Sequence, residues 1–181
     1  MNEDQLIFVA KPYLDSCRPG DWNHALRVVK WVKELGAGRE DLDTIVTAAY
    51  LHDIGWSGVI KADKVSLDKV LELEPIANAN TEKFVKEVLE QLTYDEKSIQ
   101  YILQLINATD KHEANSENEE IIVDADTLSK LCIEHLQEKF SPGSYDELII
   151  LWEKELPKRM KTREGKELYP KLLDKLKEEL K

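Results

Sequence analysis

Residue types that mark particular protein classes are scarce in this chain. It has two cysteines, seven glycines and six prolines among 181 residues. Cys17 and Cys132 lie far apart and lack the close spacing of a zinc site or a redox pair, so we expect two free thiols. The shortage of glycine and proline, together with 42% hydrophobic residues, argues against a disordered chain.

Positive charge and long apolar runs are also lacking. The chain carries 25 Lys and Arg against 36 Asp and Glu, a formal net charge of -11 at pH 7. This balance argues against double-stranded nucleic acid or an anionic membrane as a partner, but it is compatible with a local basic pocket for a small phosphorylated ligand. No apolar run reaches the ~20 residues that cross a bilayer, and the acidic N-terminal residues do not resemble a signal peptide. We therefore expect a cytoplasmic protein, whose oligomeric state the sequence leaves open.

Apolar residues recur at helical spacing along nearly the whole chain, and no segment shows the alternation of a strand. We expect helices over residues 6–14, 21–35, 41–54, 66–73, 81–92, 95–108, 119–137, 145–160 and 168–180. A loop is expected over 109–118 and a break at 141–144, and Pro157 should end or kink its helix near Leu156. The sequence therefore predicts an all-α protein of one domain, residues 1–181, with a motif-bearing core at about 21–131 and a C-terminal helical extension at about 144–181.

His52 and Asp53 form the most informative pair of the sequence. They close an apolar helical run and are followed by Gly55, a residue that commonly stops helices. One imidazole and one carboxylate are thereby placed at the inner end of a buried helix, where an unpaired charge is costly. A divalent cation would satisfy both groups, and Mn, Fe, Co, Ni and Zn accept this mixture of ligands.

Further ligands are available on two other expected helices. His24 lies on the first turn of the helix over 21–35, and Asp124 and Asp126 lie in the helix that begins near residue 119. Residues two apart on a helix point about 200° away from each other, so both aspartates cannot face one metal. Two histidines and two carboxylates suffice for an octahedral site with open positions. A metal held there lowers the pKa of bound water to as little as ~7 and polarises a phosphoryl oxygen.

The order of these residues resembles the HD-domain family of metal-dependent phosphohydrolases in its HDIG form. The block from Asp21 to Val28 contains a histidine followed by Arg-Val, residues 52–55 match the signature doublet, and residues 125–128 match the last block, Ala-Asp followed by leucine. Residues 162–166 resemble a late Thr-x-x-Gly-[Lys/Arg] element of a bacterial subgroup that includes nucleotide pyrophosphohydrolases. The resemblance implies a helical bundle of the HD type and one divalent metal ion, Mn, Fe, Co, Ni, Zn or Mg. It also implies the metal ligands, which are His24, His52, Asp53 and Asp126.

The resemblance further implies hydrolysis of a phosphate ester or anhydride by a metal-activated water, on a nucleotide or another small phosphorylated metabolite. Asp53, His112 and Lys111 are the catalytic candidates, with His112 or a lysine protonating the leaving oxygen. Many members carry a further histidine where this chain has Thr109, which puts a second metal in question. His112 is accordingly a leaving-group acid, a substrate contact or an idle loop residue. Asp124 either orients a metal ligand or faces water.

Two other functions compete with the hydrolase. A metal-bearing module without catalysis could sense a nucleotide or dock a partner, because a fold does not guarantee a function. An oxygenase with two irons would need more ligands than the sequence offers.

Lys61 and Lys64 lie near the expected mouth of the site and are interpreted mainly as solvated surface residues. No role in the site is expected for His135.

Overall fold

The structure is a computed structural model that describes residues 2–60 and 66–181. Within these residues every regular element is a helix, which confirms the all-α prediction. The elements are α1 (Glu3–Leu14), α2 (Asp21–Leu35), α3 (Leu42–Leu51), η1 (Ile54–Trp56), α4 (Leu67–Gln91), α5 (Glu96–Lys111), α6 (Glu117–Ser129), α7 (Ile133–Lys139), η2 (Pro142–Ser144), α8 (Tyr145–Arg159) and α9 (Arg163–Glu179). No helix in this described part is long and apolar enough to cross a membrane.

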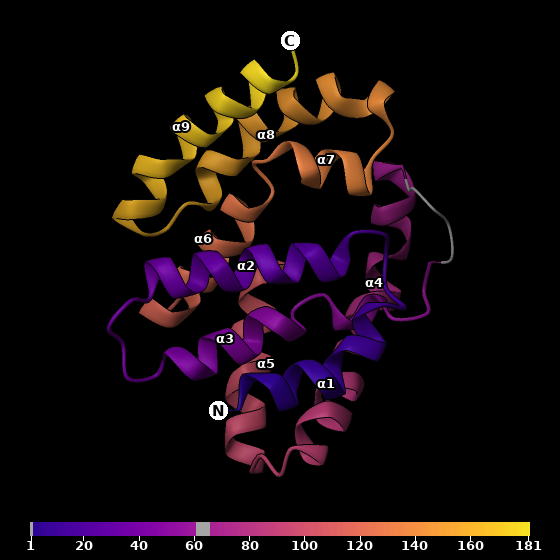
Figure 1. The fold of residues 1–181 in the computed structure, drawn as a ribbon, viewed down its shortest axis with the longest axis vertical. Coiled ribbons are helices and arrows are strands. Elements are labelled where there is room, and N and C mark those ends of the chain that lie inside the picture. Colours follow the sequence, from indigo (N-terminus) through magenta and orange to yellow (C-terminus); the bar gives the residue numbers. More distant parts are fainter. Residues whose placement is uncertain (1, 61–65) are drawn as a thin grey trace.

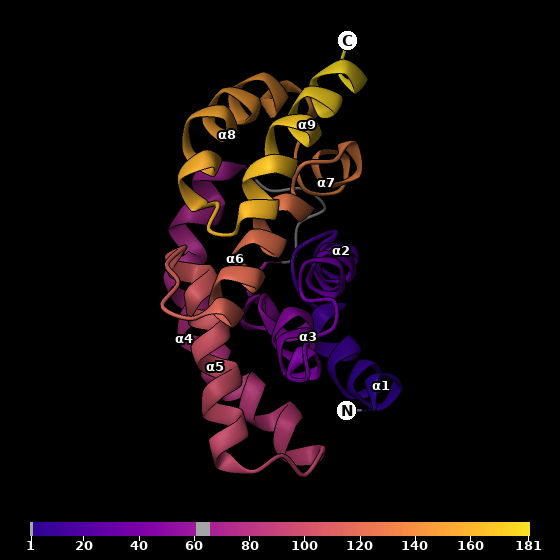
Figure 2. The same cartoon turned by 90° about the vertical axis from the view of Figure 1, so that its left-hand side faces the viewer.

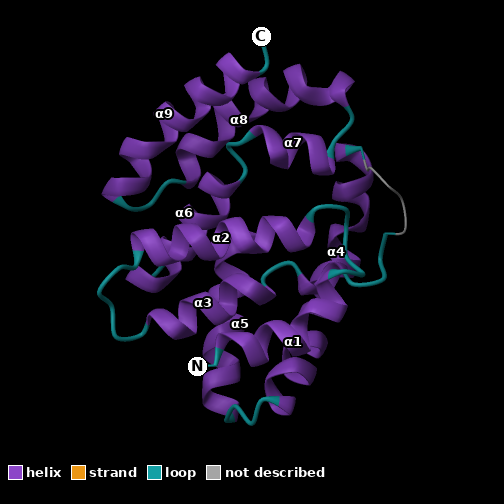
Figure 3. Ribbon diagram, viewed as in Figure 1, coloured by secondary structure: helices purple, strands orange, loops and turns teal. Residues whose placement is uncertain are grey.

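The helices form two groups that are joined by α6. In Figure 1, α1, α3 and α2 follow one another upward from the N-terminal end, and α7, α8 and α9 form a layer at the C-terminal end. Turned by 90°, Figure 2 shows α4 and α5 on the opposite side from α1, α2 and α3, with α6 between them. Helix α6 packs against α2, α5, α8 and α9. It therefore has protein on nearly every side (Figure 3).

Buried apolar side chains form two clusters that correspond to these groups. The first fills the space among α1 to α6, and Ile121, Ile122 and Ala125 of α6 belong to it. The second lies among α7, α8 and α9 and includes Leu128 of α6. Because α6 is buried all round, its polar residues are enclosed as well and need partners within the protein. Helix α6 is therefore where we expect enclosed polar side chains that contact one another or a bound ligand.

Several helix boundaries differ from those expected from the sequence. Helix α4 runs unbroken over Leu67–Gln91, although separate helices over 66–73 and 81–92 were expected. Pro75 lies inside it on an exposed side of the helix, and the following turns pack closely against η1. Proline removes only one backbone donor, and tertiary packing holds the remaining turns in helical form.

The helix expected over 119–137 is divided into α6 and α7. The Ser129 hydroxyl donates to the Asp126 carbonyl oxygen (2.6 Å), and Cys132 adopts an extended conformation (φ −147°, ψ 155°). A side-chain hydrogen bond of this kind competes with helix continuation. Helix α5 extends to Lys111, three residues further than expected, so that part of the expected loop is helical. Helix α8 continues past Pro157 to Arg159.

Gly55 brings the end of α3 against α4. A Cβ atom at this position would overlap the Ala77 carbonyl oxygen and the Thr81 hydroxyl. The glycine is therefore required by the close approach of two segments, in addition to any role in ending the helix. Helix α3 itself ends at Leu51, and His52 is its C-cap. This packing fixes the position of His52 and Asp53 relative to the rest of the bundle.

Candidate metal centre

Three side chains from three helices converge at the face of α6 that meets α2 and α3. His24 is on the first turn of α2, His52 caps α3, and Asp126 is on α6; all three are buried. The Nε2 atoms of His24 and His52 are 3.1 Å apart, and Asp126 Oδ1 lies 3.1 Å from His24 Nε2 and 3.7 Å from His52 Nε2. Each residue thus offers one ligand atom to a common point.

The hydrogen bond that each imidazole makes through Nδ1 determines which of its two nitrogens is unprotonated. His52 Nδ1 lies 2.8 Å from the Ala49 carbonyl oxygen, and because a carbonyl only accepts, Nδ1 carries the proton. The Ser129 hydroxyl already donates its proton to a carbonyl, so it accepts from His24 Nδ1 at 3.1 Å. In their neutral forms both histidines therefore point an unprotonated Nε2 toward Asp126.

This donor set fits a divalent cation. Two bare nitrogens and a carboxylate oxygen are all acceptors, and enclosed together without a proton or a cation they repel one another. Protonating His24 is not the remedy, because burial and the nearby Lys139 lower the pKa of its imidazole well below the usual value. Neutral imidazole and carboxylate are the ligand types that borderline divalent metals accept, and hydrogen bonds behind the rings fix their orientation as is common in metal sites.

Asp53 lies at the edge of the same space. Its Oδ2 atom is 3.6 Å from His52 Nε2 and 3.8 Å from His24 Nε2, but it is outside the compact group of three ligand atoms. Arg18 Nη2 lies 2.7 Å from this oxygen and Lys139 Nζ lies 3.6 Å from it. Although burial opposes ionisation, these cations hold the pKa of Asp53 well below its usual range. Asp53 is thus an ionised carboxylate that is available as a fourth ligand.

A lysine has the same effect on Asp126. Lys130 Nζ contacts Asp126 Oδ2 at 2.7 Å, and although burial acts against it, this cation keeps the pKa of Asp126 well below its usual range. Neither Lys130 nor the pairing of Arg18 and Lys139 with the site was expected from the sequence. Lys130 could have been found, because it follows Asp126 by four residues on one helix face. The pairings of Arg18 and Lys139 have no local sequence signal.

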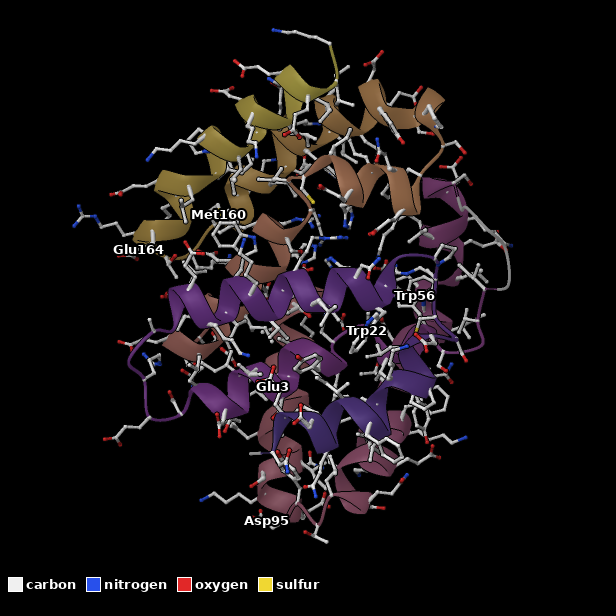
Figure 4. The ribbon with its side chains drawn as sticks, in the orientation of Figure 1. Glu3, Trp22, Trp56, Asp95, Met160 and Glu164 are labelled. Atoms are coloured by element: carbon white, nitrogen blue, oxygen red, sulfur yellow. The ribbon has the colours of Figure 1, made fainter. Side chains whose placement is uncertain are left out.

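Asp124 points away from the centre and neither orients a metal ligand nor faces water. Its carboxylate accepts hydrogen bonds from the backbone of Lys161 (2.7 Å) and Thr162 (2.8 Å) and from the Thr162 hydroxyl (2.6 Å). It thereby holds the turn between α8 and α9, where Met160 and Glu164 are labelled in Figure 4. Burial raises the pKa of Asp124. Asp124 therefore fixes the start of α9 against α6, in place of either role expected from the sequence.

The same contacts explain the Thr-x-x-Gly element. Thr162 is the N-cap of α9, and its hydroxyl oxygen accepts from the backbone N–H of Gly165 at 2.9 Å. A Cβ atom at Gly165 would overlap the Asp124 carboxylate. Helix α9 consequently begins at Arg163 and not at Leu168 as expected. The element ties the C-terminal layer to α6.

A cavity of about 250 Å³ adjoins the candidate metal centre. His24, His52, Asp53 and Asp126 contribute to its wall, and further lining comes from the first part of α4, the end of α5, α7 and the length of α8. Its volume lies just below the range for small-molecule sites, roughly 300–1,000 Å³. The cavity therefore suits a small metabolite better than a polymer.

His112 and Lys111, both proposed from the sequence, are placed differently. His112 ends α5 in the left-handed conformation (φ 56°) and lines the cavity, whereas Lys111 is exposed and outside the lining. His112 Nδ1 donates to the Thr109 carbonyl oxygen, so Nε2 is the free acceptor. Burial, Lys130 and Arg159 lower the pKa of His112 and favour its neutral form. Thr109 lines the cavity too, while Lys61 and Lys64 lie outside the described residues.

Two further cavity residues were missed. His135, for which no role was expected, is 3% exposed and lines the cavity, with its ring centroid 5.0 Å from that of His24. Its Nδ1 has no hydrogen-bond partner in the described part of the chain. Asp110 also lines the cavity, where burial and the nearby Asp53 raise its pKa to about 6. Their position in the cavity depends on how the end of α5 and helix α7 pack, which no local sequence signal indicates.

The comparisons with known proteins agree with this geometry. The model of the HD domain matches residues 21–131, from the first residue of α2 to just beyond α6. Searches of curated proteins and of solved structures found no match. The matched segment covers more than half of the chain and contains His24, His52, Asp53 and Asp126. The chain therefore belongs to the HD-domain family, within the superfamily of metal-dependent hydrolases.

Proposed function

We propose that this protein is a metal-dependent phosphohydrolase that acts on a nucleotide or another small phosphorylated metabolite. The observation that carries the proposal is the convergence of two bare Nε2 atoms and Asp126 Oδ1 beside a metabolite-sized cavity. When bound, a divalent cation supplies a Lewis acid for a phosphoryl oxygen and lowers the pKa of a water ligand to as little as ~7. The donor set is compatible with Mn, Fe, Co, Ni, Zn or Mg.

The residues of the chain have distinct tasks in this proposal. His24, His52, Asp53 and Asp126 bind the metal. Their outward partners hold them in position: Arg18 and Lys139 fix Asp53, Lys130 fixes Asp126, and the Ala49 carbonyl and the Ser129 hydroxyl fix the two rings. Substitution of such a partner is expected to lower metal affinity or activity by about 10–100-fold.

His112 is the group in the cavity best suited to move a proton. Its neutral form presents Nε2 as an acceptor, so it takes a proton first and can then return it to the leaving oxygen. Asp53 is a poor proton acceptor because its pKa is held so low, and its contribution is that of a ligand with negative charge. Lys111 is exposed, so it would have to move to reach a substrate.

The test is a screen of the purified protein with several divalent metals against phosphomonoesters, phosphodiesters and nucleoside triphosphates. Asp126→Asn serves as the matched inactive variant, and metal content is measured for both proteins. We expect turnover only with the wild-type protein and only when metal is present. A tight nucleotide complex without turnover would support the sensing module in place of the enzyme. Turnover that Asp126→Asn retains in full would contradict the proposed centre.

A further inference from the structure

Arg159 is the one cavity cation without an ion pair among the described residues. The other three are engaged: Arg18 contacts Asp53, Lys130 contacts Asp126, and Lys139 contacts Asp21. Arg159 is the last residue of α8, is half-buried and lines the cavity. A partly desolvated guanidinium without a partner is unfavourable, and its planar set of donors matches the oxygens of a phosphoryl group.

Arg159 lines the same cavity as Asp126 and His112 and interacts electrostatically with both. After burial, which lowers the pKa of Arg159, Asp126 is the group that affects it most. Arg159 in turn contributes to the lowered pKa of His112. A phosphoryl group bound at the metal centre would thus meet the guanidinium from the side of α8. The residue lies outside the segment that the HD-domain model matches.

Apolar side chains of α4 and α8 line the same cavity, beside the polar Glu74 and Glu155. Leu71 on α4 and Leu151 on α8 line it and are unusually exposed for leucines, at 56% and 37%. Trp152 continues this lining inward, and its ring packs 5.9 Å from that of His135. Exposed apolar side chains that line a cavity commonly mark a ligand contact. They line the same cavity as the metal-binding residues, so a molecule that fills the cavity would contact both.

We propose that α8, together with Leu71 of α4, selects the substrate. Arg159 binds its phosphoryl group, and an apolar strip formed by Leu71, Leu151 and Trp152 contacts its leaving group. The substrate class is then a phosphate ester of an alcohol with an apolar hydrocarbon or ring portion, which glycerol phosphate lacks. This inference rests on the proposed hydrolase function, because the leaving group is defined by that reaction. Selection of this kind operates through differences in transition-state binding.

Arg159→Met tests the phosphoryl contact. With the metal-loaded wild-type protein and hexyl phosphate as substrate, we expect Arg159→Met to raise KM and the inhibition constant of inorganic phosphate at least tenfold, with unchanged metal content. Arg159→Lys should restore part of the loss, because it returns the charge without the planar donors. Arg163→Met is the matched control, since Arg163 is 85% exposed and pairs with Glu167 on α9. Unchanged constants in Arg159→Met would overturn the assignment.

Leu151→Ser and Leu71→Ser test the apolar strip. The ratio of kcat/KM for hexyl phosphate to that for glycerol phosphate compares two primary alcohols that differ in apolar character. We expect each variant to lower this ratio about tenfold, in keeping with the value of a few methylene contacts. Ile150→Ser is the control, because Ile150 is next to Leu151 in sequence and 66% exposed but does not line the cavity. A ratio that the leucine variants leave unchanged would refute the strip.

Calorimetric titration of inorganic phosphate separates this inference from the proposed function. If the wild-type protein hydrolyses nothing with any metal, the proposed function fails, and so does the assignment of a leaving group. Binding of phosphate by the metal-loaded protein still decides the role of Arg159. We expect binding that Arg159→Met weakens at least tenfold and Arg163→Met leaves intact. Equal binding by the two variants, or no binding by the wild-type protein, would overturn the phosphoryl contact.

Discussion

The metal-binding region and the C-terminal layer of this molecule are built under different constraints. In the first, α2, α3 and α6 bring His24, His52 and Asp126 within contact distance, and the identity of each residue follows from ligand chemistry. In the second, α7, α8 and α9 pack through the cluster that contains Leu136, Trp152 and Leu173. The HD-domain model covers the first region and ends before α7. The chemistry is therefore recognisable from family resemblance, whereas most of the wall that would select a substrate is not.

Helix α6 connects the two regions through residues that lie two positions apart. Asp126 faces the histidines, and Asp124 binds the backbone at the start of α9. Positions two apart diverge by about 200° around a helix, so one helix serves both regions. Substitutions of these and neighbouring residues should therefore separate metal binding from stability.

The largest effect is expected from removing a metal ligand. His52→Ala, Asp53→Ala and Asp126→Asn should abolish metal retention and lower activity by roughly 1,000-fold or more, since metal catalysis supplies several kcal/mol and ~1.4 kcal/mol corresponds to tenfold. Metal analysis, kinetics and far-ultraviolet circular dichroism measure the three consequences. The helical signal should persist, because the first apolar cluster does not include the ligands. Full metal content in these variants would remove the basis of the metal centre.

A smaller effect is expected at the mouth of the metal-binding region. His112→Asn should lower kcat about 100-fold, the lower limit for the loss of a positioned acid or base, while metal content stays the same. Asparagine tolerates the left-handed conformation that His112 adopts, so the end of α5 should be preserved. The measurement is steady-state kinetics with a parallel metal assay. Wild-type kcat in this variant would show that His112 carries no proton in the reaction.

The contact between the two regions should control stability more than chemistry. Asp124→Ala leaves the partly buried backbone N–H groups of Lys161 and Thr162 without their acceptor, at a cost of about 1–3 kcal/mol for an unsatisfied group. Gly165→Ala should act in the same direction by crowding the Asp124 carboxylate. Urea denaturation measures both, and metal content per folded molecule should stay as in the wild-type protein. Loss of metal from Asp124→Ala at unchanged stability would exchange the roles given to the two aspartates.

The smallest effect is expected from Lys111, which is exposed and outside the cavity lining. Lys111→Ala should keep kcat/KM within about twofold of the wild-type value, because an exposed lysine is normally solvated. The comparison with His112→Asn is direct, since the two residues are adjacent at the end of α5. A loss as large as that of His112→Asn would show that Lys111 turns into the cavity when substrate binds.

The sequence by itself determined the helices and the candidate ligand residues. Apolar spacing of 3–4 residues is a local signal, and it located nearly every helix. The sequence also predicted His24, His52, Asp53 and Asp126 as metal ligands, because their order resembles a family pattern. Helical geometry indicated that Asp124 and Asp126 cannot both face one metal, and the family resemblance selected Asp126. The structure places only Asp126 beside the histidines.

The tertiary structure alone decided which other residues share the site. Helix α4 was expected to break near Pro75, and α6 was expected to continue through Lys130; neither expectation was right, because packing against η1 and the Ser129 hydrogen bond outweighed local propensity. The division of α6 from α7 turned His135 toward His24, and the length of α8 brought Arg159 to the cavity. These placements depend on which helix faces meet across more than a hundred residues of sequence. No periodicity within a single segment contains that information, since it arises only when the helices pack together.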